Sequence, residues 1–409
     1  MSGVNTGDTA WMLVATGLVM IMIPALGFFE AGLLRRKNAM SVIMQCFSGL
    51  ALLSIMWIII GFSLTFSVNN PIIGGLEWMF LNDVPLETPL SYAPSIPGIS
   101  YISFQMMFAI ITPLLMTGAF ADRMRFRTYL IFMVLWSIFI YYPLAHWVWG
   151  EGGWLRSLGV FDFAGGIVVH ISAGMGSLAA ALVIGKRKDF GPEITRPHNI
   201  PLATIGASLL WLGWFGFNAG SELTAGGIAA NTLLVSQTAS ATSSLTWIFL
   251  SWKRSGKPSA VAAINGAIAG LAGVTAASGY ISVQHSLILG LAVGIASFYA
   301  ITLIKERLKI DDALDVSSVH GITGIVGTLS IGLIASSLIN PAGPNGLFYG
   351  NPGQIVLQSI GVVSAIAFSF GGTIIIAKVL QKIIGLRVSS KEEDVGLDIS
   401  QHAERISDE

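Results

Sequence analysis

Long apolar runs separated by short polar stretches occupy almost the whole chain, and this pattern predicts helices that cross a membrane. A hydrocarbon core of about 30 Å needs roughly 20 apolar residues of helix. The runs lack the strict alternation of a transmembrane β-barrel, so the predicted fold class is an all-α polytopic membrane protein. We predict eleven transmembrane helices, at 10–34, 41–66, 99–121, 127–149, 163–186, 200–220, 228–252, 258–277, 282–304, 316–338 and 351–384. The last range is longer than one crossing needs, and we expect this helix to tilt or to protrude into water.

The composition agrees with a membrane protein. Hydrophobic residues make up 53% and charged residues 11% of the 409 residues, whereas soluble domains are about 25% charged. So few charges cannot cover a soluble globular surface of this size. Lys and Arg together number 22, as do Asp and Glu, so the net charge gives no reason to expect a nucleic-acid partner. The first residues lack the basic segment of a signal peptide, and we expect either a leader removed earlier or a first helix that acts as its own insertion signal.

Basic residues in the loops predict the orientation. Of the 22 Lys and Arg residues, 21 follow odd-numbered spans or lie in the C-terminal region, and Arg156 alone lies on the other side. Cytoplasmic loops carry such an excess. We therefore predict an external N-terminus and a cytoplasmic C-terminus in the cell membrane, that is, a bacterial inner membrane or a plasma membrane. Termini on opposite sides require an odd number of spans, which supports eleven.

Two domains follow from the hydropathy: a membrane domain at 1–384 and a cytoplasmic C-terminal tail at 385–409. The polar, charged composition of the tail favours disorder over docking to a cytosolic partner. The segment 67–98 is rich in Asn, Pro and acidic residues, and we expect it to fold over the outer mouth of the protein.

Two of the six histidines, His170 and His320, lie deep inside predicted spans. An ionisable group at that depth faces the bundle interior or a cavity and marks a candidate functional site. A histidine hydrogen-bonded to a neighbouring helix is the structural alternative. The other four are interpreted as interfacial or solvated groups: His146, His198, His285 and His402.

The two deep histidines lie in similar motifs. The fifth span carries FDFAGGIVVHISAG and the tenth carries DDALDVSSVHGITGIVG, each with acidic residues at the entry, then the histidine, then small residues. In the predicted orientation these helices are antiparallel, so the histidines approach the midplane from opposite faces. This pattern predicts an inverted repeat of five plus five spans with the eleventh helix added, an arrangement common in transporters.

An imidazole pair in this environment suits proton handling better than metal binding. Two histidines are too few for a closed site, and neither helix offers a Cys or carboxylate at ligand spacing, so we expect no metal and no cofactor. Asp162 and Asp315 precede the two histidines by eight and five residues. Imidazole has an unperturbed pKa of about 6.5, and a neutral pair that shares one proton can line a pore without an intramembrane charge.

Aromatic residues gather near the outer ends of the third, fourth and sixth spans, and a serine closes the sixth. They are Phe104, Phe108, Trp149, Trp211, Trp214, Phe217 and Ser221. An aromatic face attracts a cation, and a serine hydroxyl accepts a hydrogen bond from it. The pattern indicates an external cation site above an apolar constriction, with core packing or an interfacial aromatic belt as the alternative.

These motifs resemble those of the ammonium transporter family, the Amt, Mep and Rh proteins. The most specific segments are DFAGGIVVHISAG, GWFGFNAGS and DDALDVSSVHG, and the resemblance runs from FFEAGLLRRKNA to GLDISQH. It implies a homotrimer with one pore per subunit. It also implies an ammonium recruitment site of Phe104, Phe108, Trp149 and Ser221 with a mainly structural Asp162, a gate of Phe108 and Phe217, the twin pore histidines His170 and His320, and a pore-lining Trp214.

Some positions depart from the family pattern. Met106 and Met107 stand where small residues are frequent, and Ser317 and Ser318 precede the second histidine where an aromatic and a glycine are frequent. The family's tail couples to PII-type regulatory proteins, which makes such a protein the expected cytoplasmic partner. In this tail Ala403 stands where the family often has glycine, and the usual terminal tyrosine is missing.

The predicted function is selective transport of ammonium or methylammonium across the lipid membrane. Ammonium is recruited at the aromatic site and deprotonated, and ammonia passes the histidines while the proton is relayed or returned. Desolvating a whole cation in an apolar pore is costly, which favours this separation. The sequence leaves open whether net charge crosses. A second hypothesis is an ammonium sensor with little flux that signals through its tail. We expect no enzymatic activity; an enzyme using a metal on the histidine pair is the least favoured class.

Overall fold

The computed structural model describes residues 3–191 and 197–404. The first half contains α1 (Thr6–Leu33), η1 (Arg36–Asn38), α2 (Ala39–Met56), η2 (Trp57–Gly61), α3 (Phe62–Phe66), η3 (Met79–Leu81), α4 (Gly98–Leu114), α5 (Thr117–Phe120), α6 (Phe126–Trp136), η4 (Ser137–Tyr141), α7 (Tyr142–Trp149), α8 (Trp154–Leu158), η5 (Gly166–Ile171) and α9 (Ser172–Ile184). The second half contains α10 (Ile200–Gly220), α11 (Gly227–Ser255), α12 (Ala260–Val274), α13 (Val283–Ile301), η6 (Thr302–Arg307), η7 (Ser317–Ile322), α14 (Thr323–Ile334), η8 (Leu347–Tyr349), α15 (Gly353–Ile383), α16 (Ser390–Val395) and α17 (Leu397–His402).

Helices lie in all eleven ranges that the hydropathy predicts. Among the described residues, nine are long and apolar enough to cross a membrane. The other two are α12, which has 15 residues, and α11, whose many Ser and Thr residues lower its hydropathy. These helices support the prediction of an all-helical, multi-pass membrane protein. The number of crossings stays a prediction.

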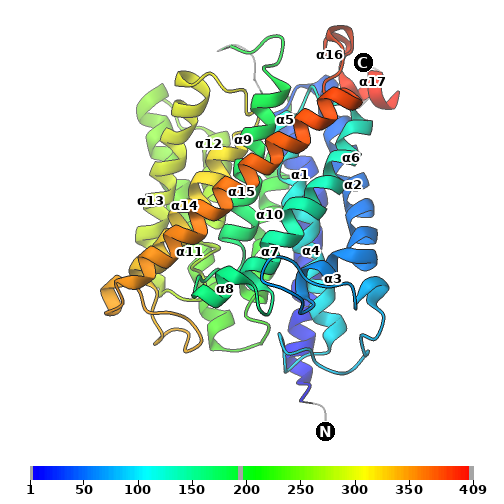
Figure 1. The fold of residues 1–409 in the computed structure, drawn as a ribbon. Helices are drawn as coiled ribbons and strands as arrows, with labels where there is room; N and C mark the ends of the chain where they lie inside the picture. The colour runs from blue at the N-terminus through cyan, green and yellow to red at the C-terminus, as the bar shows by residue number, and fades with distance from the viewer. Residues whose placement is uncertain (1–2, 192–196, 405–409) are drawn as a thin grey trace.

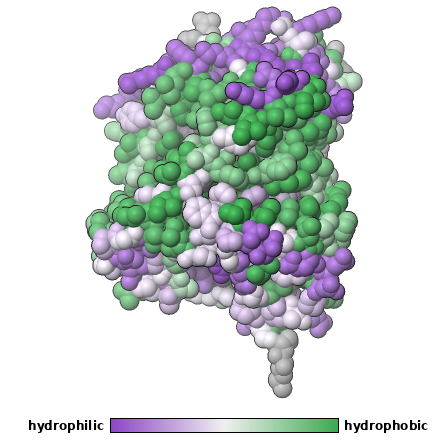
Figure 2. Space-filling model, in the orientation of Figure 1, coloured by the Kyte–Doolittle hydropathy of each residue, from purple (hydrophilic) through white to green (hydrophobic). Residues whose placement is uncertain are grey.

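The helices pack side by side in one bundle, with the N-terminus at one end and the C-terminus at the other (Figure 1). We call these ends the N face and the C face. On the side of the molecule shown in Figure 2, a hydrophobic band lies between two more polar ends, and strongly hydrophilic side chains concentrate at the C face. Termini at opposite ends fit an odd number of crossings. The long α15 runs diagonally across the bundle, so the expected tilt of the last helix is observed (Figure 1).

The tail is ordered as far as the structure describes it, so the expectation of a disordered tail is wrong for residues 385–404. Asp398 in α17 is buried and accepts hydrogen bonds from the backbone N–H groups of Met40 and Ser41 at the start of α2, at 3.1 and 2.7 Å. Lys37 donates to the carbonyl oxygens of Glu393 and Asp394. Because the first N–H groups of a helix have no partner inside it, the tail supplies acceptors that α2 needs. Composition alone contains no trace of this pairing.

Candidate functional site

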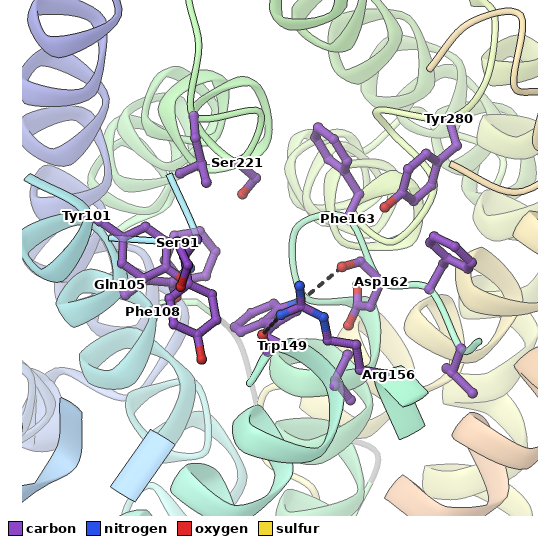
Figure 3. Close-up of a pocket in the computed structure, with 15 residues that line it drawn as sticks. Ser91, Tyr101, Gln105, Phe108, Trp149, Arg156, Asp162, Phe163, Ser221 and Tyr280 are labelled. Atoms are coloured by element: carbon purple, nitrogen blue, oxygen red, sulfur yellow. Dashed lines mark hydrogen bonds between the residues drawn. The ribbon is translucent and has the colours of Figure 1, made fainter. Parts of the chain in front are cut away.

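A pocket of about 450 Å³ opens at the N face. It is lined by Ser91, Tyr92, Tyr101, Gln105, Phe108, Val148, Trp149, Arg156, Val160, Phe161, Asp162, Phe163, Ser221, Leu223 and Tyr280. Ser221 and Phe108 lie on one side of it, and Arg156 and Asp162 on the other (Figure 3). The segment 67–98 contributes Ser91 and Tyr92 to the wall, as the expectation of a segment folded over this mouth predicts.

An aromatic pair forms the floor of the pocket. The ring centroids of Phe108 and Phe217 lie 4.2 Å apart, and both side chains are only 1% exposed. Trp149 meets Phe108 edge-to-face at 5.9 Å. Phe104 lies 5.0 Å from Phe108 and packs against Gly220, and it is not among the lining residues. Any solute that goes deeper must displace the rings of Phe108 and Phe217.

Oxygen atoms in the pocket remain free to accept hydrogen bonds. The Ser221 hydroxyl donates its proton to the Phe217 carbonyl at 2.9 Å, which leaves the lone pairs of its oxygen for a ligand. The side-chain oxygen of Gln105 is buried and has no partner. An ammonium ion, which only donates, matches such acceptors beside an aromatic face.

Asp162 holds the wall of the pocket in place. Its side-chain oxygens accept four backbone N–H groups, from Gly165, Gly166, Ile167 and Val168, at 2.7 to 3.1 Å. These are the unpaired donors at the start of η5, the helix that carries His170. The Asp162 carbonyl also accepts from Trp149 Nε1 at 3.0 Å. Asp162 therefore fixes both the tryptophan above and the histidine helix below, which suits a structural role.

Three ionisable groups modify the electrostatics of the mouth. The exposed Arg156 donates to the Trp149 carbonyl and lies over the Tyr92 ring at 5.8 Å, so a positive charge stands at the rim of the pocket. Burial raises the pKa of Tyr92 to about 12, so its hydroxyl stays neutral. Glu222 follows Ser221, and burial raises its pKa to about 7. The mouth thus has less negative charge near neutral pH than its acidic residues suggest.

The two deep histidines meet below the aromatic floor. Nδ1 of His170 and Nδ1 of His320 lie 3.2 Å apart, and both side chains are buried. The rings stack on Trp214, with centroids 5.5 and 6.4 Å from it, and Phe217 lies 6.0 Å from His170. Residues 150 positions apart in the chain thus form one hydrogen-bonded pair directly under the floor of the pocket.

Thr275, which follows α12, fixes the tautomers of the pair. Its hydroxyl donates to the Leu271 carbonyl at 2.7 Å and accepts from Trp214 Nε1 at 3.1 Å. No proton is left for His170 Nε2, 3.3 Å away, so that nitrogen must donate to Thr275. Neutral His170 then accepts at Nδ1 from Nδ1–H of His320. Nε2 of His320 is the ring nitrogen left without a proton.

Small residues bring the two histidine helices together. Gly174 in α9 and Gly321 in η7 touch so closely that a Cβ on Gly174 would lie 2.2 Å from the Gly321 Cα. Each histidine lies within one turn of this crossing. The chain enters η5 at the N face and η7 at the C face: Arg187, after α9, pairs with Asp311, before η7, at 2.8 Å. The helices are antiparallel, as the motif comparison predicts.

Two small cavities of about 20 Å³ each continue beyond the aromatic floor. The first is lined by Phe217, Trp214 and both histidines, with apolar side chains around them. The second lies on the other side of His320 and is lined by Glu30 and Asn265 among apolar residues. The pocket, the floor, the histidine pair and the second cavity follow one another through the bundle.

Comparison with known proteins identifies this arrangement. The model of the Ammonium Transporter Family matches residues 10–406. The chain belongs to the ammonium transporter family. It is 52% identical over 405 residues to Ammonium transporter 1 of Dictyostelium discoideum, covering 98% of this chain and 87% of that protein. It is 44% identical over 401 residues to Ammonium transporter Amt1 of Archaeoglobus fulgidus, covering 98% and 99%.

Two solved structures have the same fold as this chain. The crystal structure of Saccharomyces cerevisiae Mep2 matches with a TM-score of 0.90 and 32% identity, over 95% of this chain and 89% of that one. A structure described as a sensor Amt protein matches with a TM-score of 0.89 and 29% identity, over 97% and 98%. Mep2 and the sensor Amt protein thus share this helix arrangement.

Two sequence interpretations need correction in this family member. His146, expected to be interfacial or solvated, is fully buried, and its ring nitrogens each lie 2.8 Å from a carbonyl oxygen, of Thr65 and of Asn70. It fastens the start of the segment 67–98 to the bundle. Trp211, grouped with Trp214 in the predicted aromatic cluster, does not lie beside it at the histidine pair. Its Nε1 donates to Gln237 of α11 instead.

Sequence reasoning missed three residues along the path: Gln105, Thr275 and Glu30. Gln105 and Glu30 each interrupt an apolar span, and a polar group inside a span is a signal that could have found them. Thr275 carries no such signal, because a threonine at the end of a helix usually bonds its own backbone. The Thr275 oxygen accepts from both Trp214 and His170 only because the fold brings α10 and η5 next to it.

Proposed function

We propose that this protein transports ammonium across the cell membrane along the path from the N-face pocket to the histidine pair. The observation that carries the proposal is the order of the groups: free oxygen acceptors and aromatic faces, then the Phe108–Phe217 floor, then a neutral imidazole pair. The N face is external and the C face cytoplasmic. Ammonium binds beside Trp149 and Ser221 and loses a proton, and ammonia passes the floor.

The chemistry of the pair favours the separation of ammonia from its proton. A cation in an apolar passage with no counter-charge is costly to desolvate, whereas ammonia is not charged. The hydrogen bond between the two Nδ1 atoms lets a proton move along the same line without a free ion. Alkali ions cannot shed a proton, so this route excludes them.

In this proposal the protein forms a homotrimer of eleven-helix subunits. Each subunit is an inverted repeat of five plus five spans with one pore. The docked tail offers a surface to a PII-type regulatory protein.

A sensor is the second candidate, favoured by the likeness to the sensor Amt protein over almost the whole chain. The two are separated by uptake of labelled methylammonium into liposomes that hold the purified protein, combined with recording of ammonium-evoked current on a supported membrane. A transporter gives saturable uptake well above that of empty liposomes. Binding without uptake supports the sensor instead. Uptake with current means that net charge crosses, and uptake without current means neutral flux.

The three pocket variants Phe108→Ala, Trp149→Leu and Ser221→Ala are expected to weaken apparent methylammonium affinity. Loss of a cation–π contact costs about 0.5–2 kcal/mol, and loss of a hydrogen bond to a charged group costs about 1.5–3 kcal/mol. Since 1.4 kcal/mol is tenfold, we expect the half-saturation concentration to rise roughly 2- to 30-fold in Phe108→Ala and Trp149→Leu and roughly 10- to 140-fold in Ser221→Ala. Concentration-dependent uptake measures it. Phe139→Ala, at an exposed position, is the matched control. Unchanged affinity in all three variants would mean that the cluster only packs.

Arg156→Gln is expected to tighten apparent ammonium affinity at low ionic strength. The guanidinium lies at the rim of the pocket, and a like charge near a bound cation costs about 0.5–1.5 kcal/mol at surface dielectric values. We therefore expect the half-saturation concentration of the variant to be two- to tenfold lower than that of wild type at about 0.01 M salt. This difference should disappear at about 1 M salt, where the Debye length falls to about 3 Å. Arg156→Lys keeps the charge and should keep the wild-type salt dependence. A salt-independent change in Arg156→Gln would assign the effect to the bond with the Trp149 carbonyl.

A further inference from the structure

Glu30 is a carboxyl group buried near the C-face end of α1, and the path described so far does not use it. Glu30 is only 2% exposed and lies one turn before the helix ends at Leu33. At 1.5 Å per residue, this position lies roughly 36 Å along α1 from its first residue, far from the pocket at the N face. An ionisable group at such a place needs a partner or a function.

The cavity beside Glu30 continues the ammonia path. It shares His320 and four apolar residues with the cavity at the histidine pair: Leu26, Phe29, Leu115 and Ile268. Its volume of about 20 Å³ suffices for one water or ammonia molecule. Glu30, Asn265 and His320 are its polar lining residues, and the rest are apolar. A small polar molecule that leaves His320 towards the C face therefore meets Glu30.

The hydrogen bond between Glu30 and Thr117 favours the neutral acid, whereas the Gly118 backbone N–H also donates to the carboxyl group. The Thr117 oxygen lies 2.8 Å from a carboxyl oxygen of Glu30 and 2.6 Å from the Leu114 carbonyl oxygen. One hydroxyl proton cannot serve both acceptors, and the carbonyl can only accept. A protonated Glu30 resolves the conflict, because it donates to Thr117 while Thr117 donates to Leu114. The proton of Glu30 is then held within reach of the cavity.

Among the residues that the structure describes, the charged and titratable groups around Glu30 include no positive partner. Three groups interact electrostatically with Glu30: Asp312 in the segment before η7, Cys46 in α2 and Tyr129 in α6. His320 faces the shared cavity. A lone carboxylate among these groups in an apolar bundle is costly. The neutral acid is therefore the favoured form of Glu30.

We propose that Glu30 is the proton donor that turns ammonia back into ammonium at the C-face end of the path, an assignment that rests on the proposed transport function. The O–H bond of Glu30 breaks, its proton forms the fourth N–H bond of ammonium, and the electron pair stays on the carboxylate. The ammonium ion leaves past Asn265. The proton released by ammonium at the N face passes His170 and His320 and, through a water molecule in the cavity, restores the acid. One ammonium enters and one leaves per cycle.

The test compares Glu30→Gln and Glu30→Asp with wild type in liposomes. Glu30→Gln keeps the shape and removes the acid, and we expect ammonium-evoked current to fall at least tenfold, while the half-saturation concentration changes less than twofold because the N-face pocket is intact. Glu30→Asp keeps an acid and should recover part of the current. Glu87→Gln, at an exposed position in the segment 67–98, is the matched control and should behave as wild type. Equal currents in wild type and Glu30→Gln would overturn the proposal.

Infrared difference spectroscopy of the wild-type protein provides a second readout that requires no functional variant. A protonated carboxyl has its own carbonyl band, and we expect addition of ammonium to change that band in wild type and not in Glu30→Gln. A band that ammonium leaves unchanged in wild type overturns the role of Glu30 even if the variants fail to fold. Failure of the proposed transport function looks different: wild type itself then gives neither uptake nor current.

Discussion

Replacing both His170 and His320 by alanine is expected to abolish ammonium-evoked current. The two Nδ1 atoms, 3.2 Å apart, are the hydrogen-bonded link between the cavity under Phe217 and the cavity at Glu30. Alanine removes both the link and the stacking partners of Trp214. A positioned proton-transfer group contributes typically about 10²–10⁴-fold to a rate, so we expect current to fall about 100-fold or more. Current on a supported membrane measures this.

Controls separate loss of proton relay from general damage. His285→Ala removes a histidine near the N face that contacts Ser282 and Tyr349, and it should retain wild-type current. Thr275→Val leaves both histidines but removes the oxygen that fixes their tautomers, and we expect an intermediate loss. Wild-type-sized currents in the double variant, without a potassium leak, would contradict a proton relay through the pair. Currents that appear together with a potassium leak would mean that the histidines exclude ions rather than relay protons.

Gly174→Ala is expected to destabilise the protein strongly, although it adds a single methyl group. That carbon would lie 2.2 Å from the Gly321 Cα and 2.3 Å from the Gly321 nitrogen. Both contacts are with backbone, so no side chain can turn aside, and the two histidine helices must separate. Overpacking a tight core costs about 1–3 kcal/mol and occasionally more, and we expect the upper end or beyond. The melting temperature of the purified protein in detergent measures the loss, and transport should fall with it.

Gly371→Ala is the matched control for this prediction. Gly371 lies within α15, and a Cβ there meets nothing within 4 Å. Alanine is more favourable than glycine inside a helix by roughly 1 kcal/mol, so the melting temperature should stay the same or rise. Equal melting temperatures for Gly174→Ala and Gly371→Ala would contradict the prediction. They would mean that α9 and η7 can move apart at their crossing without loss of stability.

The tail and His146 show where sequence reasoning met its limit. The composition of residues 385–404 favours disorder, yet Asp398 and Lys37 connect this segment to the start of α2. His146 lies near the end of a span, where contact with water is usual, yet the segment after α3 folds back and encloses it. In both cases the deciding partner lies more than 70 residues away in the chain. Local composition describes a segment, and it does not describe the neighbour that the fold brings.

The sequence by itself determined the membrane class, the helical ranges and the choice of His170 and His320, because these follow from local properties. Hydropathy depends on about 20 consecutive residues, and an ionisable group inside such a run is visible without a fold. The tertiary structure alone decided which groups share a proton. The crossing at Gly174 and Gly321 aligns two Nδ1 atoms, and Thr275 sets their tautomers. Hydrogen bonds act over about 3 Å, so they depend on the packing of helices that the order of residues does not reveal.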